Sequence, residues 1–141
     1  MRVAFDALEL RDAWLDSDPS ARWRLNVALS EITGTESCSL IYFELDPGCR
    51  LARHTDSAEE ILYIVSGTAE AEVGDEVGLV RAGDLAVIPA MVPHGLRNVG
   101  ELTVKVVGFF SHAVIYSEFE EPLQPIGQTV LPEMAPIPVA A

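Results

Sequence analysis

Glycine and proline residues divide this chain into short segments, and this division limits the folds that it can adopt. Between them lie runs rich in β-branched and other apolar residues, each roughly four to ten residues long, which suits strands better than helices. The runs cover residues 23–32, 39–45, 61–65, 69–73, 77–81, 85–88 and 102–110. The turn residues are Pro47, Gly48, Gly67, Gly74, Gly83, Pro89, Pro93, Gly95 and Gly100. Short strands separated by turns predict an all-β sandwich or barrel.

The alternation within one run indicates how the strands are arranged. In residues 68–73, Glu70 and Glu72 alternate with small apolar residues, so the acids would face water and the apolar side chains the core. We therefore expect antiparallel sheets with one solvent-facing side. Only residues 5–15 show a helical periodicity, which predicts a short helix there.

One domain accounts for the 141 residues, since domains commonly contain about 100 to 200. Hydrophobic residues make up 49% of the chain, enough for one core. We expect residues 1–22 to form an N-terminal extension and residues 23–119 the barrel. Five of the nine prolines lie in residues 120–141, which predicts an extended C-terminal arm.

The charge of the chain excludes several classes of partner. Nine Lys and Arg residues against 22 Asp and Glu residues give a formal net charge of −13, which repels phosphate backbones and anionic lipids. We therefore expect neither a nucleic acid nor a membrane as partner. The first residues turn acidic before a signal-peptide core could form, so we expect a soluble, cytoplasmic protein. Cys38 and Cys49 are too few for a disulfide framework.

Four residues that can bind a metal ion stand at a regular spacing: His54, Asp56, Glu60 and His94. Side chains two apart on a strand share a face, so His54 and Asp56 would point into the same space. A hairpin would carry Glu60 onto the neighbouring strand, and a distant strand would supply His94. Imidazoles and carboxylates that converge inside a barrel suit Fe, Mn, Zn, Ni or Cu, so the pattern predicts a divalent transition metal.

Two segments around these residues have the spacing of a known motif pair. The first segment has five residues between Gly48 and His54, three between Asp56 and Glu60, and six between Glu60 and Gly67. The second has five residues between Gly83 and Pro89, four between Pro89 and His94, and three between His94 and Asn98. This ordered pair resembles the two motifs of the cupin superfamily.

The resemblance implies an antiparallel jelly-roll β-barrel, the double-stranded β-helix of the family, that holds a small ligand. It also implies a homodimer, since small cupins commonly pair through their N-terminal strands. Two positions depart from the family pattern. Asp56 stands where the family usually has its second histidine, and Met91 stands where the second motif usually has glycine.

Asp56 leaves three interpretations of the site open. All four side chains could bind the ion, so that two carboxylates neutralise it. Alternatively, the carboxylate of Asp56 could fall short, because it ends roughly 2 Å nearer its own Cα than the outer nitrogen of histidine, and metal bonds of about 2.0 to 2.2 Å tolerate little slack. His54, Glu60 and His94 would then bind the ion, and Asp56 would be a candidate catalytic base. The third interpretation is a site without metal.

The function that the resemblance implies is a metal-dependent enzyme acting on a small organic molecule. We expect a dioxygenase with iron as the most plausible metal, in which Asp56 takes or relays a proton. A non-catalytic module that binds or senses a metal or metabolite, and a cupin isomerase or lyase, are the alternatives. Four apolar or aromatic residues near the motifs are predicted walls of the substrate pocket: Tyr42, Leu62, Met91 and Phe109.

Overall fold

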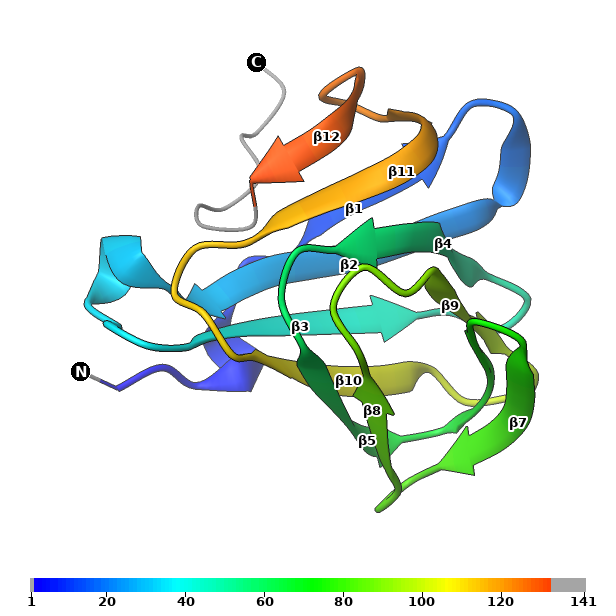
Figure 1. Cartoon of the computed structure of the whole chain (residues 1–141). Helices are drawn as coiled ribbons and strands as arrows, with labels where there is room; N and C mark the ends of the chain where they lie inside the picture. Colours follow the sequence, from blue (N-terminus) through cyan, green and yellow to red (C-terminus); the bar gives the residue numbers. More distant parts are fainter. Residues whose placement is uncertain (1, 133–141) are drawn as a thin grey trace.

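Strands account for nearly all the regular structure in the computed structural model, which describes residues 2–132 (Figure 1). The strands are β1 (Arg11–Leu15), β2 (Asp18–Leu29), β3 (Ser39–Leu45), β4 (Arg50–Asp56), β5 (Glu60–Ser66), β6 (Thr68–Val73), β7 (Glu76–Arg81), β8 (Leu85–Ile88), β9 (His94–Asn98), β10 (Val104–Phe110), β11 (Tyr116–Leu123) and β12 (Gln128–Pro132). Two short 3-10 turns, η1 (Phe5–Ala7) and η2 (Glu31–Thr33), are the helical elements among these residues. No helix of the described part is long and apolar enough to cross a membrane.

The strands form two six-stranded antiparallel sheets. The first has the order β1-β2-β3-β10-β5-β8 and the second the order β12-β11-β4-β9-β6-β7. Neighbouring strands often come from remote parts of the chain: β3 pairs with β10, and β4 with β9. This arrangement confirms the predicted all-β antiparallel jelly roll.

The core lies between the two sheets. On β3, Ile41, Phe43 and Leu45 alternate toward the interior and are at most 8% exposed. On β10, Val104 and Val106 are fully buried and face the same space. Burial of one face of each sheet against the other supplies the main stabilisation of such a sandwich.

The helix predicted over residues 5–15 of the N-terminal segment is wrong. Only the single turn η1 is helical, and residues 11–15 form strand β1. Ala13 and Leu15 are buried at a spacing of two, and β1 pairs with β2 along its length. The apolar side chains therefore meet the core as a strand, because the ladder to β2 overrides the local helical pattern.

Strand β11 and strand β12 form a hairpin at one edge of the second sheet. The predicted arm over residues 120–141 therefore begins within β11, and residues 133–141 lie outside the described residues. Strand β11 pairs with β4 from Ser117 to Phe119. This pairing brings residues near the end of the chain next to those of the first motif.

Candidate metal centre

The strands β4 and β9 bring two histidines together. His54 and His94 are directly opposite each other across the antiparallel pair, with ring centroids 4.3 Å apart. His54 Nδ1 lies 2.7 Å from the carbonyl oxygen of Ala52, and His94 Nδ1 lies 2.9 Å from that of Val92. In a neutral ring, Nδ1–H then donates to the carbonyl and Nε2 carries the free lone pair. Such a backbone hydrogen bond fixes the tautomer that binds a metal through Nε2.

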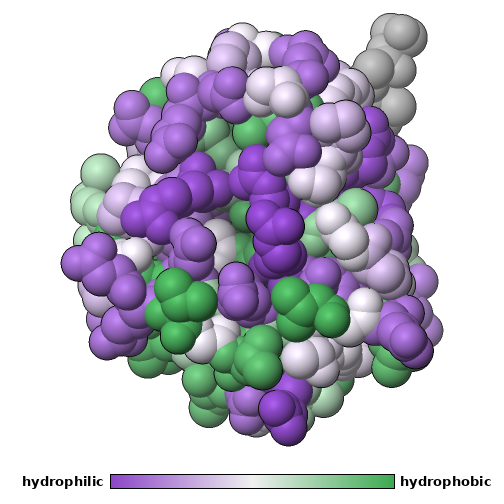
Figure 2. Space-filling view, turned by 90° about the vertical axis from the view of Figure 1, so that its right-hand side faces the viewer, coloured by the Kyte–Doolittle hydropathy of each residue, from purple (hydrophilic) through white to green (hydrophobic). Residues whose placement is uncertain are grey.

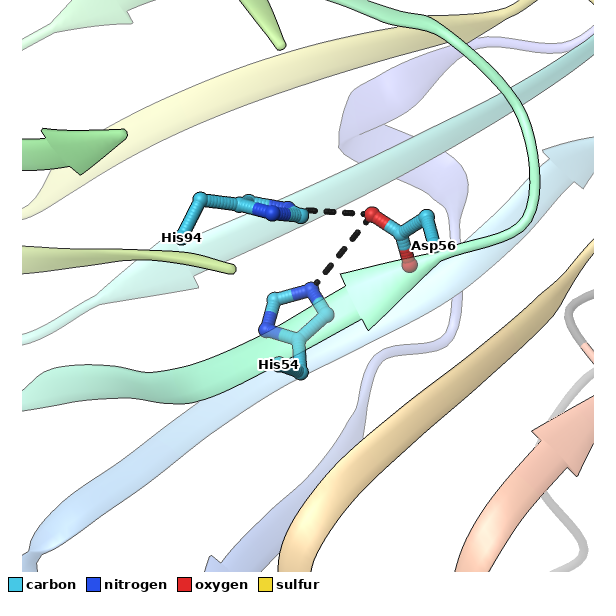
Figure 3. A group of neighbouring side chains, drawn as sticks. All are labelled: His54, Asp56 and His94. Atoms are coloured by element: carbon cyan, nitrogen blue, oxygen red, sulfur yellow. Dashed lines mark ion pairs between the residues drawn. The ribbon is translucent and has the colours of Figure 1, made fainter. Parts of the chain in front are cut away.

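Asp56 completes a compact group of donor atoms with the two histidines (Figure 3). Asp56 Oδ2 lies 3.0 Å from His94 Nε2 and 3.6 Å from His54 Nε2. Two donors bound to one ion at about 2.0 to 2.2 Å are separated by roughly 3 to 3.5 Å. The separations from Asp56 Oδ2 are close to this range, and the donor atoms of all three side chains lie within 4.8 Å of one another, so the group could hold one transition-metal ion.

The burial of this group also fits a cation. The side chains of His54, Asp56, Glu60 and His94 are each at most 9% exposed. Asp56 Oδ2 and His94 Nε2 are buried and face each other without a well-aligned hydrogen bond. Such a buried pair requires a positive charge between its atoms, which a proton on His94 or a metal ion bound to both would supply.

Glu60 lies at the edge of the group, at the start of β5. Its Oε1 is 3.6 Å from His94 Nε2, but Glu60 is not part of the compact trio. The structure thus brings all four predicted ligands to one place. It places Asp56 Oδ2 beside the Nε2 atoms of both histidines.

Without a metal ion, the two buried carboxyl groups of the site require a positive charge beside them. Burial opposes a charge on His94, but the Asp56 and Glu60 carboxylates outweigh it and raise the pKa of His94 to about 10. Burial also works to raise the pKa of Asp56, yet the two histidines hold it well below its usual range. Burial raises the pKa of Glu60, and the Asp56 carboxylate adds to this effect. A proton on His94 therefore supplies the positive charge in the metal-free chain.

Ser117 on β11 orients the Asp56 carboxylate, and sequence reasoning did not find it. Its hydroxyl donates a hydrogen bond of 2.5 Å to Asp56 Oδ1, which leaves Oδ2 facing the histidines. Both residues are about 3% exposed or less. Ser117 lies outside both motif segments, and a serine in a strand carries no signal of such a role. Only the pairing of β11 with β4 reveals it.

Gly108 on β10 provides the space that the Glu60 carboxylate occupies. A Cβ atom at this position would collide with Glu60 Oε2 and would lie 2.9 Å from Ile41 Cγ2. Any larger residue at position 108 must therefore displace Glu60 or the strand beside it. In the sequence, Gly108 is only a glycine within an apolar run. A glycine inside a strand can indicate that another group approaches the backbone closely, but it does not say which group.

A small cavity adjoins the site. It offers about 30 Å³, room for roughly one or two water molecules, and its walls are mostly apolar. His54, Asp56, Glu60, His94 and Ser117 line it together with Trp23, Leu25, Ile41, Phe43, Leu51, Leu62, Leu96, Phe110, Phe119 and Leu123.

Of the predicted pocket walls, Leu62 lines this cavity and the other three do not. Tyr42 and Phe109 alternate with the inward-facing residues of their strands and point to the opposite face of the sheet. Tyr42 stacks on Phe5, and Phe109 is 46% exposed. Met91 is 57% exposed on the β8–β9 loop, where it lines a second, more open hollow together with His54 and Phe119. Aromatic character near a motif therefore did not reveal which face a strand residue occupies.

Two further motif positions have structural roles. Asn98 donates hydrogen bonds to the carbonyl oxygens of Leu45 and Leu102, which secures the turn between β9 and β10. Met91 adopts a φ of 64°, the left-handed region that favours glycine. The glycine that the family pattern has here would meet this requirement without strain.

Comparison with known proteins agrees with this architecture. Residues 41–110 match the family model Cupin_2, described as a cupin domain. No curated protein matches the sequence.

Several solved structures have a similar fold. Oxalate decarboxylase of Lactobacillus farciminis, in a formate complex, aligns with a TM-score of 0.68 and 19% identity over 79% of this chain and 33% of that chain. This chain thus spans about a third of the length of that enzyme. The polyketide cyclase RemF of Streptomyces resistomycificus aligns with a TM-score of 0.63 and 20% identity over 78% of each chain.

A third similar structure is an uncharacterized conserved protein with a double-stranded β-helix domain from Klebsiella pneumoniae. It aligns with a TM-score of 0.55 and 25% identity over 62% of this chain and 70% of that chain. Identities this low show a shared fold and not a shared activity. The matched residues carry both motif segments and the strands that hold His54 and His94, and so the chain contains a cupin domain with the double-stranded β-helix fold.

Proposed function

We propose that this protein is a metal-dependent enzyme that acts on a small organic molecule. The observation that carries the proposal is the convergence of His54, Asp56 and His94, whose donor atoms lie within 4.8 Å of one another in a buried site. The donor set suits a divalent transition metal rather than Mg²⁺ or Ca²⁺, which prefer all-oxygen sites.

The finer proposal is a dioxygenase with ferrous iron. Two histidines and one carboxylate are the ligand set of non-haem iron oxygenases, and this set leaves further coordination positions open. When bound, the ion would supply a Lewis acid and a one-electron redox centre. Both atoms of O2 would enter the substrate, which supplies the electrons, so that no separate reductant is required.

The residues around the donor trio would select and orient the substrate. The cavity walls are mostly apolar, and Leu62, Phe110 and Phe119 are among them. The space of about 30 Å³ admits only a very small molecule or one part of a larger one. With Asp56 in the donor trio, Glu60 is the neighbouring carboxyl that remains to accept a proton, since its Oε1 stands 3.6 Å from His94 Nε2.

Anaerobic loading with ferrous iron tests this proposal. The wild-type protein should bind close to one iron per chain, and nitric oxide should give the electron paramagnetic resonance signal of an iron–nitrosyl complex, because open positions remain beside the ion. His94→Ala should lose both the metal and the signal while keeping its circular dichroism spectrum. His112→Ala is the matched control, since His112 is exposed and lies outside the site.

Two outcomes would contradict the proposal at different levels. If the protein retained none of Fe, Mn, Zn, Ni and Cu, the proposal of a metal-dependent enzyme would be wrong. Iron binding without a nitrosyl signal would show that no coordination position is open to a diatomic ligand, and the dioxygenase proposal would then be wrong. Oxygen uptake by the iron-loaded protein with a panel of small organic acids and phenols then identifies the substrate class.

A further inference from the structure

The two sheets are not joined at the side of the molecule where β7 and β8 lie. Strand β8 ends the first sheet and β7 ends the second, and no described strand pairs with the free edge of either. Figure 1 shows both strands in the lower part of the molecule. Between them is a hollow of about 260 Å³, which we call the β7–β8 hollow. Its walls are Ala71, Val73, Glu76, Val77, Gly78, Leu79, Val80, Ala86 and Val87.

The β7–β8 hollow lies between the sheets and not on an outer face. Ala71 of β6 is 8% exposed and belongs to the core, and Gly78 of β7 lies directly opposite it, so both residues face inward. Val73 and Val80 of the second sheet pack against the core, and so does Ala86 of the first. The hollow therefore opens the interior of the sandwich to solvent.

The hollow is next to the cavity of the candidate metal centre. Three of its residues lie directly opposite three residues of the cavity: Val73 opposite His94, Ala71 opposite Leu96, and Ala86 opposite Leu62. Directly opposite residues of antiparallel strands point to the same face, with Cβ atoms about 5 Å apart. The strand register thus places the hollow one residue away from the metal site.

The walls of the hollow are mostly apolar, and a glycine keeps part of it free. Val77, Leu79 and Val87 are 58% to 61% exposed at its rim, although solvent-facing strand positions are ordinarily polar. In Figure 2, hydrophobic side chains gather in the lower part of the molecule, the level that β7 and β8 occupy in Figure 1. A Cβ atom at Gly78 would meet no atom of a non-adjacent residue within 4 Å. The hollow therefore has room for an apolar ligand.

Neither the hollow nor the cavity offers a basic side chain to an anionic ligand. None of the described residues that line them is a lysine or an arginine, and their acidic residues are Asp56, Glu60 and Glu76. The two arginines of β4 form ion pairs elsewhere, Arg50 with Asp18 at 2.8 Å and Arg53 with Glu72 at 2.9 Å.

The acidic groups of the metal site add to this preference. Asp56 and Glu60 already set two carboxyl groups against the charge of a divalent ion. A further carboxylate without a cation beside it is costly to bury. An uncharged molecule therefore fits the two spaces better than an organic acid.

We propose that the β7–β8 hollow binds the apolar body of an uncharged substrate, whose polar end extends past Leu62 and Leu96 to the metal centre. The hollow of about 260 Å³ approaches the volume of common ligand pockets, whereas the cavity of about 30 Å³ admits only the reacting end. The extension to the metal rests on the proposed enzymatic function, but the binding of the apolar body does not. Among small organic molecules, this arrangement selects phenols over carboxylic acids.

Two probes with the same ring system provide the test: 2-naphthol, which is uncharged at neutral pH, and the anion 2-naphthoate. In calorimetric titrations of the metal-free chain, 2-naphthol should bind roughly tenfold or more tightly than 2-naphthoate, because the carboxylate finds no cation in the hollow. Adding 2-naphthol to the cobalt-loaded chain should also change the visible absorption of Co²⁺, because the hydroxyl group extends to the metal centre.

Variants of Gly78 locate the binding. Gly78→Phe fills the hollow and should weaken 2-naphthol binding by roughly tenfold or more without changing the metal affinity. Val130→Phe is the matched control and should bind like wild type, because Val130 is 47% exposed on β12, at the opposite edge of the same sheet.

A third variant tests the preference for an uncharged ligand. Gly78→Lys adds a cation to the hollow and should reverse the preference, so that 2-naphthoate binds more tightly than 2-naphthol. Its long side chain can reach solvent, so this variant decides the question even if Gly78→Phe does not fold. Circular dichroism checks the fold of all three variants.

Four outcomes would contradict different parts of the proposals. Equal 2-naphthol affinities of wild type and folded Gly78→Phe, or no binding to wild type at about 1 mM, would overturn the assignment of the hollow. Equal affinities of wild type for both probes would overturn the preference for uncharged molecules. An unchanged cobalt spectrum with 2-naphthol bound would overturn the link to the metal centre. A chain that retains no metal would contradict the proposed function, while the titrations of the metal-free chain would still decide the binding.

Discussion

Ser117 Oγ donates a hydrogen bond of 2.5 Å to Asp56 Oδ1, and this contact joins strand β11 to the centre of the candidate metal site. The bond holds one carboxylate oxygen in place and leaves the other toward His54 and His94. A residue that orients a ligand in this way commonly changes metal affinity by about 10- to 100-fold when it is removed.

We therefore expect Ser117→Ala to weaken metal binding by roughly tenfold while the fold persists. The affinity can be measured by competition with a chromophoric chelator. Ser117→Thr retains a hydroxyl and should recover part of the lost affinity. Equal affinities of wild type and Ser117→Ala would show that Asp56 does not need this hydrogen bond or does not bind the ion.

Gly108→Ala should destabilise the protein by about 1 to 3 kcal/mol, because the added methyl group takes the space of the Glu60 carboxylate. Urea unfolding measures the free energy. Glu60→Asp shortens the acidic side chain, so the double variant should lose less stability than the two single losses added together. Additive losses would mean that the two positions are not coupled.

The stability of the metal-free protein should decrease between about pH 6.5 and pH 10. The pKa of His94 is raised from 6.5 to about 10 in the folded chain, so the folded state binds more protons than the unfolded state in this range. The stabilisation is complete below pH 6.5 and is lost as the pH rises through 10, with a slope of at most about 1.4 kcal/mol per pH unit. Denaturation in urea at several pH values measures it.

A bound metal ion should remove this slope, because it replaces the proton on His94. His94→Gln should also lack it in the metal-free form. If His94→Gln retained the wild-type pH dependence, another group would be responsible.

Met91→Gly should stabilise the protein by about 0.5 to 1 kcal/mol. The φ of 64° is unfavourable for a methionine and costs a glycine little, although glycine loses more backbone entropy on folding. Thermal unfolding detects the gain. Met91→Ala retains a Cβ atom and should show none, so a gain of equal size in both variants would contradict the backbone explanation.

The strands with an ordinary hydrophobic pattern could be predicted from the sequence. Residues 39–45 and 85–88 were predicted with the observed bounds of β3 and β8. The runs 61–65, 69–73 and 77–81 are each extended by one or two residues in β5, β6 and β7. Their pattern can be recognised because inward residues of these strands, such as Ile64, Ala69 and Val80, pack in or against the core.

The strands that carry the site could not be predicted from the hydrophobic pattern. Inward positions of β4 hold His54 and Asp56, and the first inward position of β9 holds His94, so polar residues occupy the places where apolar ones mark a strand. The spacing of the motif pair located these residues instead. It could not locate Ser117 or Gly108, because their roles depend on contacts between strands that are distant in the sequence.

The pairing of β4 with both β9 and β11 has a consequence for synthesis. The group that holds Asp56 in position comes from residue 117, long after the residues of the first motif have left the ribosome. A nascent chain that ends before β11 has both histidines and the carboxylate but not the serine that orients it. Tight capture of a metal ion should therefore come late in biogenesis, so that newly made chains do not sequester metal before the barrel is complete.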